Sequence, residues 1–209
     1  MIRIIRPQAP PALARNELRW LDRLAAARTD EDRKKARSKY GHQQVRRALE
    51  TTFHGKCAYC ESKIKHVSFA HIEHFRPQSV FPNLTFSWSN LLLACEVCNS
   101  EAYKGARFPD ASEDGPYVNP CEDDPDDHFQ FLFDARTQVA SVYGITPRGR
   151  TTERDLGLNR SDLRVHRSGY VRMLFCISRF AATDAGAREL LQEARSPTSE
   201  YSAFAVHCT

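Results

Sequence analysis

The sequence predicts an α+β protein with a small centre of two strands and a helix, preceded by helices and followed by a β-hairpin and more helices. Two Cys-x-x-Cys pairs bracket the centre, in the segments CAYC from Cys57 and CEVC from Cys95. Helical periodicity marks the residues before Cys57, whereas Phe129, Phe131 and Phe133 alternate as in a strand. The chain therefore divides into a basic helical region (residues 1–56), a core (residues 57–109), and a C-terminal region of acidic connector, β-hairpin and helices (residues 110–209).

The composition is that of a soluble globular protein, with 41% hydrophobic and 27% charged residues among 209. No apolar run is long enough to cross a bilayer, so no membrane partner is expected. The formal net charge of +4 is unevenly spread, because residues 108–135 contain acids and no Lys or Arg. Basic residues crowd the first third, and they include Arg33, Lys34, Lys35, Arg37, Lys39, Arg46 and Arg47. This asymmetry predicts a basic face for a polyanion, although an ordinary solvated surface explains it equally well.

The two cysteine pairs predict a structural zinc site. Each pair has the spacing that lets a tight turn aim two sulfurs at one ion, and a closed four-thiolate site is structural, not catalytic. The zinc ligands are expected to be Cys57, Cys60, Cys95 and Cys98. The alternatives are two disulfides or unpaired buried thiols. The polar N-terminus has no apolar segment of a secretory signal, and because the cell interior keeps thiols reduced, a metal is favoured.

Two helices are expected before the core. Apolar positions from Leu13 to Leu24 fit one helical stripe, and a second helix is expected from Asp30 to Phe53. Gly41 is expected to break the second helix and Gly55 to end it.

Between the cysteine pairs, the segment from Val67 to Ile72 alternates as a strand does. Two prolines, Pro77 and Pro82, then predict an irregular loop. Ser89 or Asn90 is expected to cap a short helix that carries Leu91, Leu92 and Leu93.

After the acidic connector, a β-hairpin is expected from the segment HFQFLFDARTQVASVYG, with its turn at residues 134–136. Four helical segments follow, near residues 152–158, 161–182, 185–195 and 199–207. Cys176 is expected to be a small core residue of the second of these helices.

A second, hydrolytic site is predicted within the core. A carboxylate such as Glu73 suits a hard divalent ion, Mg²⁺ or Mn²⁺, and the imidazole of His74 beside it suits a general base. Asn99 offers a second oxygen ligand, while Arg76 and Lys104 are candidates to neutralise charge on a phosphate. His71, on the face of Glu73, is a candidate metal ligand or a residue that orients that carboxylate, and the second role is favoured. Each residue alone has a structural explanation; their combination in one frame favours catalysis.

These residues also resemble a known family. The pattern CAYC…IEHFRP…SNLLLACEVCN…K is similar to the HNH endonucleases, which have a ββα-metal core. The resemblance implies that His74 activates water and that Glu73 and Asn99 bind the catalytic metal. It also implies that Asn90 holds the loop of the ββα unit and that Lys104 is the lysine that commonly follows the last signature position. Two departures are the glutamate in place of the frequent aspartate and the missing Gly-rich turn after the proline.

A further resemblance, through IEHFRPQS, NPCEDDPDDHFQF and DLGLNRSDL, is to the HNH component of bacterial anti-phage Septu and retron-associated systems. It implies a cytoplasmic defence nuclease that works with an ABC-type ATPase partner. The expected substrate is nucleic acid, DNA in preference to RNA. The alternative function is a non-catalytic zinc module that binds nucleic acid or acts as a scaffold.

Overall fold

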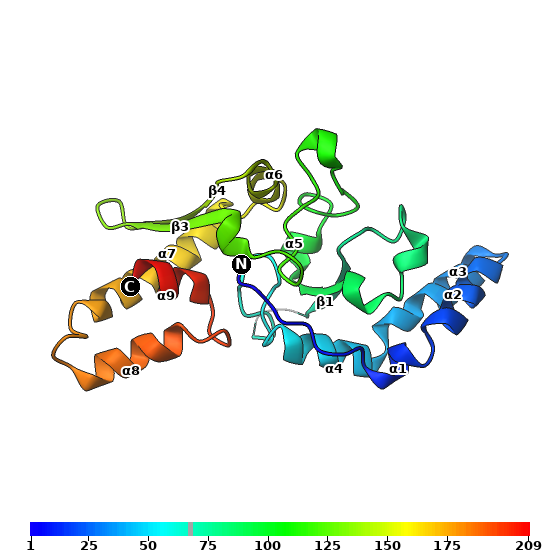
Figure 1. Ribbon diagram of the computed structural model, residues 1–209, viewed down its shortest axis with the longest axis horizontal. Helices are drawn as coiled ribbons and strands as arrows, with labels where there is room; N and C mark the ends of the chain where they lie inside the picture. The colour runs from blue at the N-terminus through cyan, green and yellow to red at the C-terminus, as the bar shows by residue number, and fades with distance from the viewer. Residues whose placement is uncertain (67–68) are drawn as a thin grey trace.

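The N-terminal third is an extended arm followed by short helices (Figure 1). The computed structural model describes residues 1–66 and 69–209. The first elements are α1 (Pro11–Ala14), α2 (Glu17–Ala26), α3 (Asp30–Arg37), the 3-10 turn η1 (Ser38–Gly41) and α4 (Gln43–Thr52). The predicted break at Gly41 is confirmed, since η1 ends there and α4 begins two residues later. Thr29 caps α3 by accepting a hydrogen bond from the Asp32 amide.

The arm is fixed against the centre of the molecule by side-chain hydrogen bonds. The Arg6 Nη1 donates to the carbonyls of Trp88 and Leu91, each at 2.8 Å. In return, the Trp88 Nε1 donates to the Pro7 carbonyl at 2.8 Å. The arm therefore closes over the segment that enters the second central strand.

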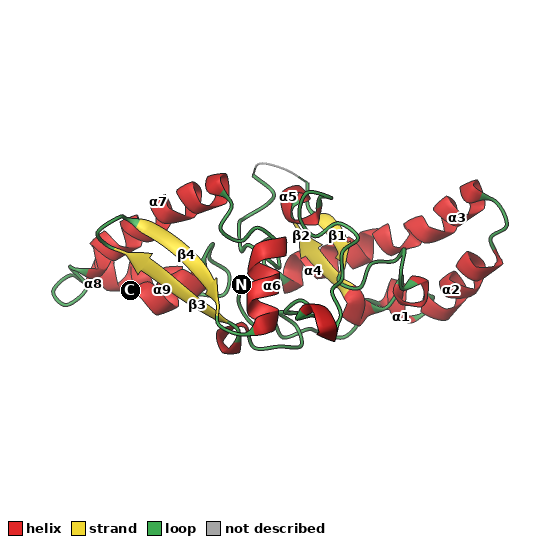
Figure 2. Cartoon of the chain, turned by 90° about the horizontal axis from the view of Figure 1, so that it is seen from above, coloured by secondary structure: helices red, strands yellow, loops and turns green. Residues whose placement is uncertain are grey.

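The centre is a strand pair followed by a helical turn. β1 (His71–His74) pairs antiparallel with β2 (Leu91–Ala94), and α5 (Glu96–Asn99) follows β2 directly. Helix α4 packs against β2, and α5 packs against β1 (Figure 2). The predicted α+β fold with a strand-strand-helix centre is confirmed.

Two predictions for the centre were wrong in detail. Leu91 to Leu93, expected on a short helix, form β2. All three leucines are fully buried, and a short strand covered on both faces has a continuous apolar sequence that periodicity cannot separate from a helix. The first strand is also shifted, because β1 starts at His71 and includes Glu73 and His74. Residues 67–68 of the predicted strand lie outside the described residues.

The C-terminal region forms the other end of the elongated molecule (Figure 1). Its elements are β3 (Phe129–Asp134), β4 (Val139–Gly144), α6 (Pro147–Asp155), α7 (Ser161–Ser178), α8 (Ala185–Ala194) and α9 (Ser202–Cys208). The predicted hairpin is confirmed by the antiparallel pairing of β3 with β4. Helix α6 starts five residues earlier than expected, where Pro147 occupies the first turn and Thr146 caps it.

A buried arginine joins the hairpin to α7. The Arg167 guanidinium donates to the carbonyls of Ala140 and Leu158, at 2.9 and 2.8 Å, and to Asn159 Oδ1 at 2.8 Å. Its burial lowers the pKa of Arg167 to about 10. Because every bond goes to a neutral acceptor, this charge orders the junction of β4 and α7 at some cost in desolvation.

Two further features concern the exposure of Cys176 and the length and apolar character of the helices. Cys176, predicted in the core, is exposed on α7. Among the helices of residues 1–66 and 69–209, none combines the length and apolar character that a bilayer crossing requires.

Candidate active site and metal centre

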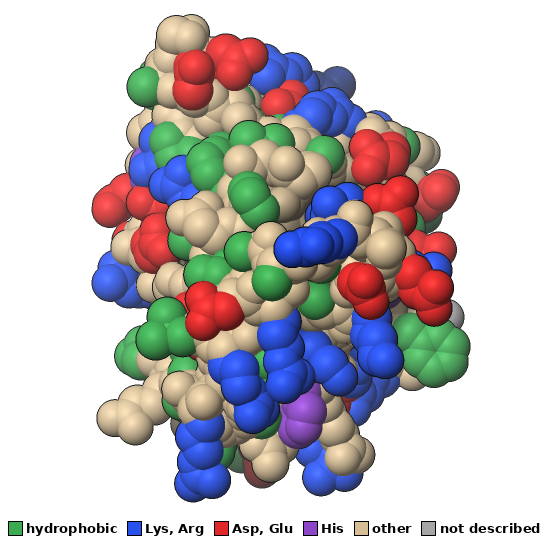
Figure 3. All heavy atoms as spheres, turned by 90° about the vertical axis from the view of Figure 1, so that its right-hand side faces the viewer, with side chains coloured by type: hydrophobic (Ala, Val, Ile, Leu, Met, Phe, Trp, Pro, Cys, Tyr) green, Lys and Arg blue, Asp and Glu red, His purple; other side chains and the backbone are tan. Residues whose placement is uncertain are grey.

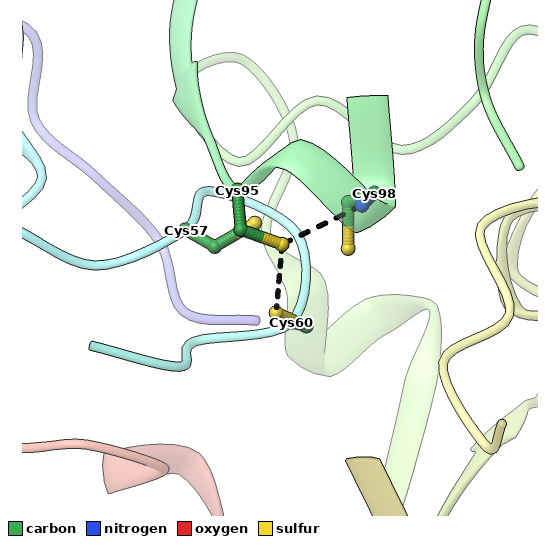
Figure 4. A group of neighbouring side chains, drawn as sticks. All are labelled: Cys57, Cys60, Cys95 and Cys98. Carbon is green, nitrogen blue, oxygen red and sulfur yellow. Dashed lines mark hydrogen bonds between the residues drawn. The ribbon is translucent and has the colours of Figure 1, made fainter. Parts of the chain in front are cut away.

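The four predicted zinc ligands meet at one point (Figure 4). Cys57 and Cys60 lie on the turn after α4, Cys95 is the N-cap of α5, and Cys98 lies within that helix. Their four Sγ atoms are all within 4.8 Å of one another. Tetrahedral zinc with Zn–S bonds of about 2.3 Å needs sulfurs about 3.8 Å apart, and the Sγ atoms of Cys60 and Cys95 are 3.9 Å apart. All seven cysteines are free, so the alternative of two disulfides was wrong.

The thiolate cluster also has a charge partner. Arg160, at the start of α7, points Nη1 at Cys98 Sγ over 3.5 Å, and its guanidinium lies over the Tyr103 ring. Burial opposes the charge of Arg160, but the thiolates of Cys98 and Cys60 outweigh it and raise the pKa of Arg160. A cation here offsets the excess negative charge that four thiolates leave around a divalent ion.

His74 is held in the form that a general base needs. Its Nε2 lies 2.9 Å from the Thr85 carbonyl oxygen. Because a carbonyl only accepts, Nε2 carries the proton and Nδ1 is left with a free lone pair. Burial lowers the pKa of His74, and the charges of Lys104 and Arg37 lower it further against the opposing Thr85 bond. The Tyr40 ring packs edge-on against the imidazole, with centroids 4.7 Å apart.

Glu73 and Lys104 form an ion pair beneath the site. The Glu73 side chain is almost wholly buried, and its Oε1 contacts Lys104 Nζ and, at 3.5 Å, the Tyr59 hydroxyl. Lys104 is fully buried and also donates to the His74 carbonyl at 3.0 Å. Burial raises the pKa of the Glu73 carboxyl, and the ammonium opposes that rise. Lys104 therefore lies under the carboxylate, away from the surface where it was expected to contact phosphate.

Asn90 holds the loop between the strands. Its Oδ1 accepts from the Arg76 amide at 2.8 Å, and its Nδ2 donates to the carbonyls of Arg76 and Leu84 at 3.0 and 3.2 Å. The Arg76 guanidinium lies over the rings of Phe81 and Phe108. Arg76 is thus part of the loop's packing and is not among the residues that line the cavity described next.

A cavity of about 300 Å³ joins the remaining residues. Glu73, His74 and Asn99 all line it, so the structure brings these three predicted residues together. His71 contacts Asn99, with its Nδ1 3.3 Å from Asn99 Nδ2, in place of the expected contact with Glu73. A carboxylate and an amide oxygen are hard donors of the kind that Mg²⁺ or Mn²⁺ prefers. A larger cavity of about 890 Å³ adjoins it and shares Tyr40, Ile72 and Asn99 as walls.

Comparison with known proteins identifies the same segment of the chain. The HNH endonuclease family model matches residues 57–105, the segment that carries both cysteine pairs and the three cavity residues. Residues 57–105 are therefore the part of the chain that resembles the HNH endonucleases, and we call them the HNH domain. A Septu protein PtuB from Bacillus thuringiensis is 32% identical over 83% of this chain and 59% of the relative. Another, from Bacillus mycoides (strain KBAB4), is 36% identical over 44% of this chain and 40% of the relative. The chain thus spans about half the length of these relatives.

Some residues of the site lie outside the HNH domain. Arg37, the last residue of α3, and Tyr40 of η1 line the same cavity as Glu73 and His74. Sequence reasoning placed Arg37 in a general basic face and did not single out Tyr40. No spacing rule links either residue to a motif that begins at Cys57, so only the folded structure, in which Tyr40 contacts His74, identifies them.

Proposed function

We propose that this protein is a metal-dependent endonuclease that hydrolyses phosphodiester bonds of nucleic acid. The observation that carries the proposal is the neutral imidazole of His74, held through Nε2 by Thr85, on the wall of a cavity that Glu73 and Asn99 share. A base with a free Nδ1, beside hard oxygen donors that can bind a metal ion, can activate water next to a phosphate.

In the proposed reaction, His74 removes a proton from the attacking water. The side-chain oxygens of Glu73 and Asn99 would hold Mg²⁺ or Mn²⁺. Such an ion, when bound, polarises the phosphate and stabilises charge on the leaving oxygen. Lys104 favours the ionised form of Glu73 against the effect of burial, and Asn90 keeps the loop of Thr85 closed over His74. Glu73, Asn90, Asn99 and Lys104 thus support the one residue that moves the proton.

We further propose that the four cysteines hold structural Zn²⁺. The convergence of the four sulfurs, with the cation of Arg160 beside them, supports a tetrahedral thiolate-bound ion such as zinc. Because a preformed site is absent from the unfolded chain, zinc binding would contribute on the order of 10 kcal/mol to folding.

The proposed substrate is DNA. Basic residues of the N-terminal helices support a polyanion, since Arg33, Lys34, Lys35, Arg46 and Arg47 are all exposed. Figure 3 shows Lys and Arg side chains gathered on the face formed by this end of the molecule. Binding should weaken steeply with salt, as phosphate contacts release counterions. RNA is the alternative substrate.

By similarity to the Septu proteins, we propose a role in anti-phage defence with an ABC-type ATPase partner. The acidic connector and the hairpin β3–β4 are the candidate partner surface. Affinity purification from the native host should recover the ATPase with the tagged chain. Purification of the chain without any ATPase, under conditions that preserve other complexes, would contradict the partnership.

Plasmid nicking tests the nuclease. Wild-type protein should convert supercoiled DNA to open circles in Mg²⁺ or Mn²⁺, and His74→Ala should not. His207→Ala, a histidine of α9 that contacts Asp126, is the matched control and should cleave normally. Cleavage that survives His74→Ala would remove His74 as the base. DNA and RNA binding without cleavage by the wild type, with or without the partner, would favour the alternative of a non-catalytic zinc module.

A further inference from the structure

Phosphodiester hydrolysis needs positive charge at the phosphate, because negative charge grows on its oxygens in the transition state. Neither cation expected from the sequence can supply this charge in the structure. Lys104 is fully buried in its ion pair with Glu73, and Arg76 lies over the rings of Phe81 and Phe108. A cationic side chain that acts on the phosphate in addition to the proposed metal ion would have to come from another part of the chain.

Arg37 is the cation that lines the cavity. It is the last residue of α3, and it shares the cavity walls with Glu73, His74 and Asn99. Three residues later, Tyr40 packs edge-on against the His74 ring. This contact places the corner between α3 and η1 directly beside the imidazole, so the position of Arg37 follows from packing against the HNH domain.

The hydrogen bonding of Arg37 is incomplete in a way that indicates a ligand. Its Nε–H is buried and has no acceptor within the part of the chain that the structure describes. Leaving a buried donor unpaired costs about 1–3 kcal/mol, so such groups are rare and call for a partner. Gln78 lines the same cavity, and its Oε1 is a buried acceptor that likewise lacks a donor. A site with one unpaired cationic donor and one unpaired acceptor suits a phosphate accompanied by an ordered water.

We propose that Arg37 is a catalytic residue that binds a non-bridging oxygen of the scissile phosphate. This inference rests on the proposed nuclease function and names the group that neutralises the phosphate. The planar guanidinium can present Nε–H and one terminal N–H to the same phosphate, which an ammonium cannot do. The catalytic site is consequently composite, because residues 57–105 supply the base and the metal ligands and α3 supplies the phosphate clamp.

Steady-state cleavage by Arg37→Gln tests the proposal. Loss of one such charged donor should lower kcat about 100- to 1,000-fold, with zinc content and melting temperature unchanged. Arg37→Lys should recover only part of kcat, because it restores the charge without the two-pronged geometry. A fall in kcat smaller than about tenfold, or a change confined to KM, overturns the proposal.

Two arginine variants are matched controls with the same loss of charge. Arg33→Gln removes an exposed cation one helical turn earlier on α3. It should raise KM and make binding less dependent on salt, because one phosphate contact is lost, and it should not reproduce the fall in kcat. Arg172→Gln lies on α7, at the opposite end of the molecule (Figure 1), and should alter neither constant.

Chemical rescue decides the case in which Arg37→Gln loses stability. Millimolar guanidinium ion added to Arg37→Ala should restore part of the cleavage rate if the missing group acts at the phosphate. Absence of any rescue overturns the proposal. If wild-type protein cleaves no nucleic acid in Mg²⁺ or Mn²⁺, the proposed function itself fails. If the wild type cleaves and Arg37→Gln has the same kcat, only the role of Arg37 fails.

Discussion

The ion pair of Glu73 and Lys104 leads to a sharp stability prediction. Lys104 is fully buried and Glu73 is 4% exposed, so the carboxylate has little access to water if the ammonium is removed. Lys104→Met keeps the volume of the side chain but removes the ammonium and its bond to the His74 carbonyl. The Glu73 carboxylate would then keep only neutral partners, the Tyr59 hydroxyl and the His74 backbone amide.

Removing one partner of a buried pair costs about 3–5 kcal/mol, because the other charge is left uncompensated. In a chain of this size, that loss corresponds to a fall in melting temperature of about 6 to 20 °C. Denaturant unfolding at a fixed zinc concentration, followed by circular dichroism, measures the change as a shift of midpoint. Lys65→Met is the control, since Lys65 and Glu50 form an exposed pair worth less than about 1 kcal/mol.

The double variant Glu73→Gln/Lys104→Met removes both charges and should be more stable than Lys104→Met alone. The coupling energy from this double-mutant cycle reports the pair itself. Additive losses, or a Lys104→Met variant with the wild-type midpoint, would refute the argument that Lys104 compensates the buried carboxylate.

Three further predictions concern the metal centre, the base and the loop. Cys95→Ser should lose zinc and unfold, whereas Cys176→Ser, which changes an exposed thiol, should keep both zinc and fold; metal analysis and thermal melting measure this. His74→Ala should retain zinc and the wild-type fold while losing cleavage, and loss of zinc from this variant would show that the two sites are not independent. Asn90→Ala should lower the free energy of unfolding by about 1–3 kcal/mol and reduce cleavage, because three loop hydrogen bonds disappear. Asn83→Ala, at an exposed position of the same loop, should do neither.

Much of the architecture follows from local rules. The paired cysteines predicted a common metal centre because thiolates at two-residue spacing converge on one ion. The alternating phenylalanines predicted β3 because one face of that strand is buried and the other exposed, which is the condition for a period of two. Gly41 marked the end of η1 because glycine weakens a helix at the point where the chain changes direction.

The central strands could be predicted less well from the sequence, for physical reasons. Leu91 to Leu93 are buried on both faces, so the period that separates strand from helix is absent. The prediction that Cys176 is buried was also wrong. Apolar neighbours in the sequence do not determine which side of α7 faces the hairpin. In both cases tertiary contacts decide what local sequence leaves open.

The charged residues of the site show more clearly how far their positions can be predicted from the sequence. The positions of Glu73, His74 and Asn99 follow from a short motif, because β1 and α5 are adjacent elements of one small unit. The positions of the cations do not, since a long flexible side chain can serve the surface, the core or a ligand with equal ease. Lys104 follows Asn99 closely in sequence yet is buried below the carboxylate, whereas Arg37 is distant in sequence yet lines the cavity. Within the described residues the Nε of Arg37 has no acceptor, which only the folded chain reveals, and the proposal that α3 contributes to the active site rests on this observation.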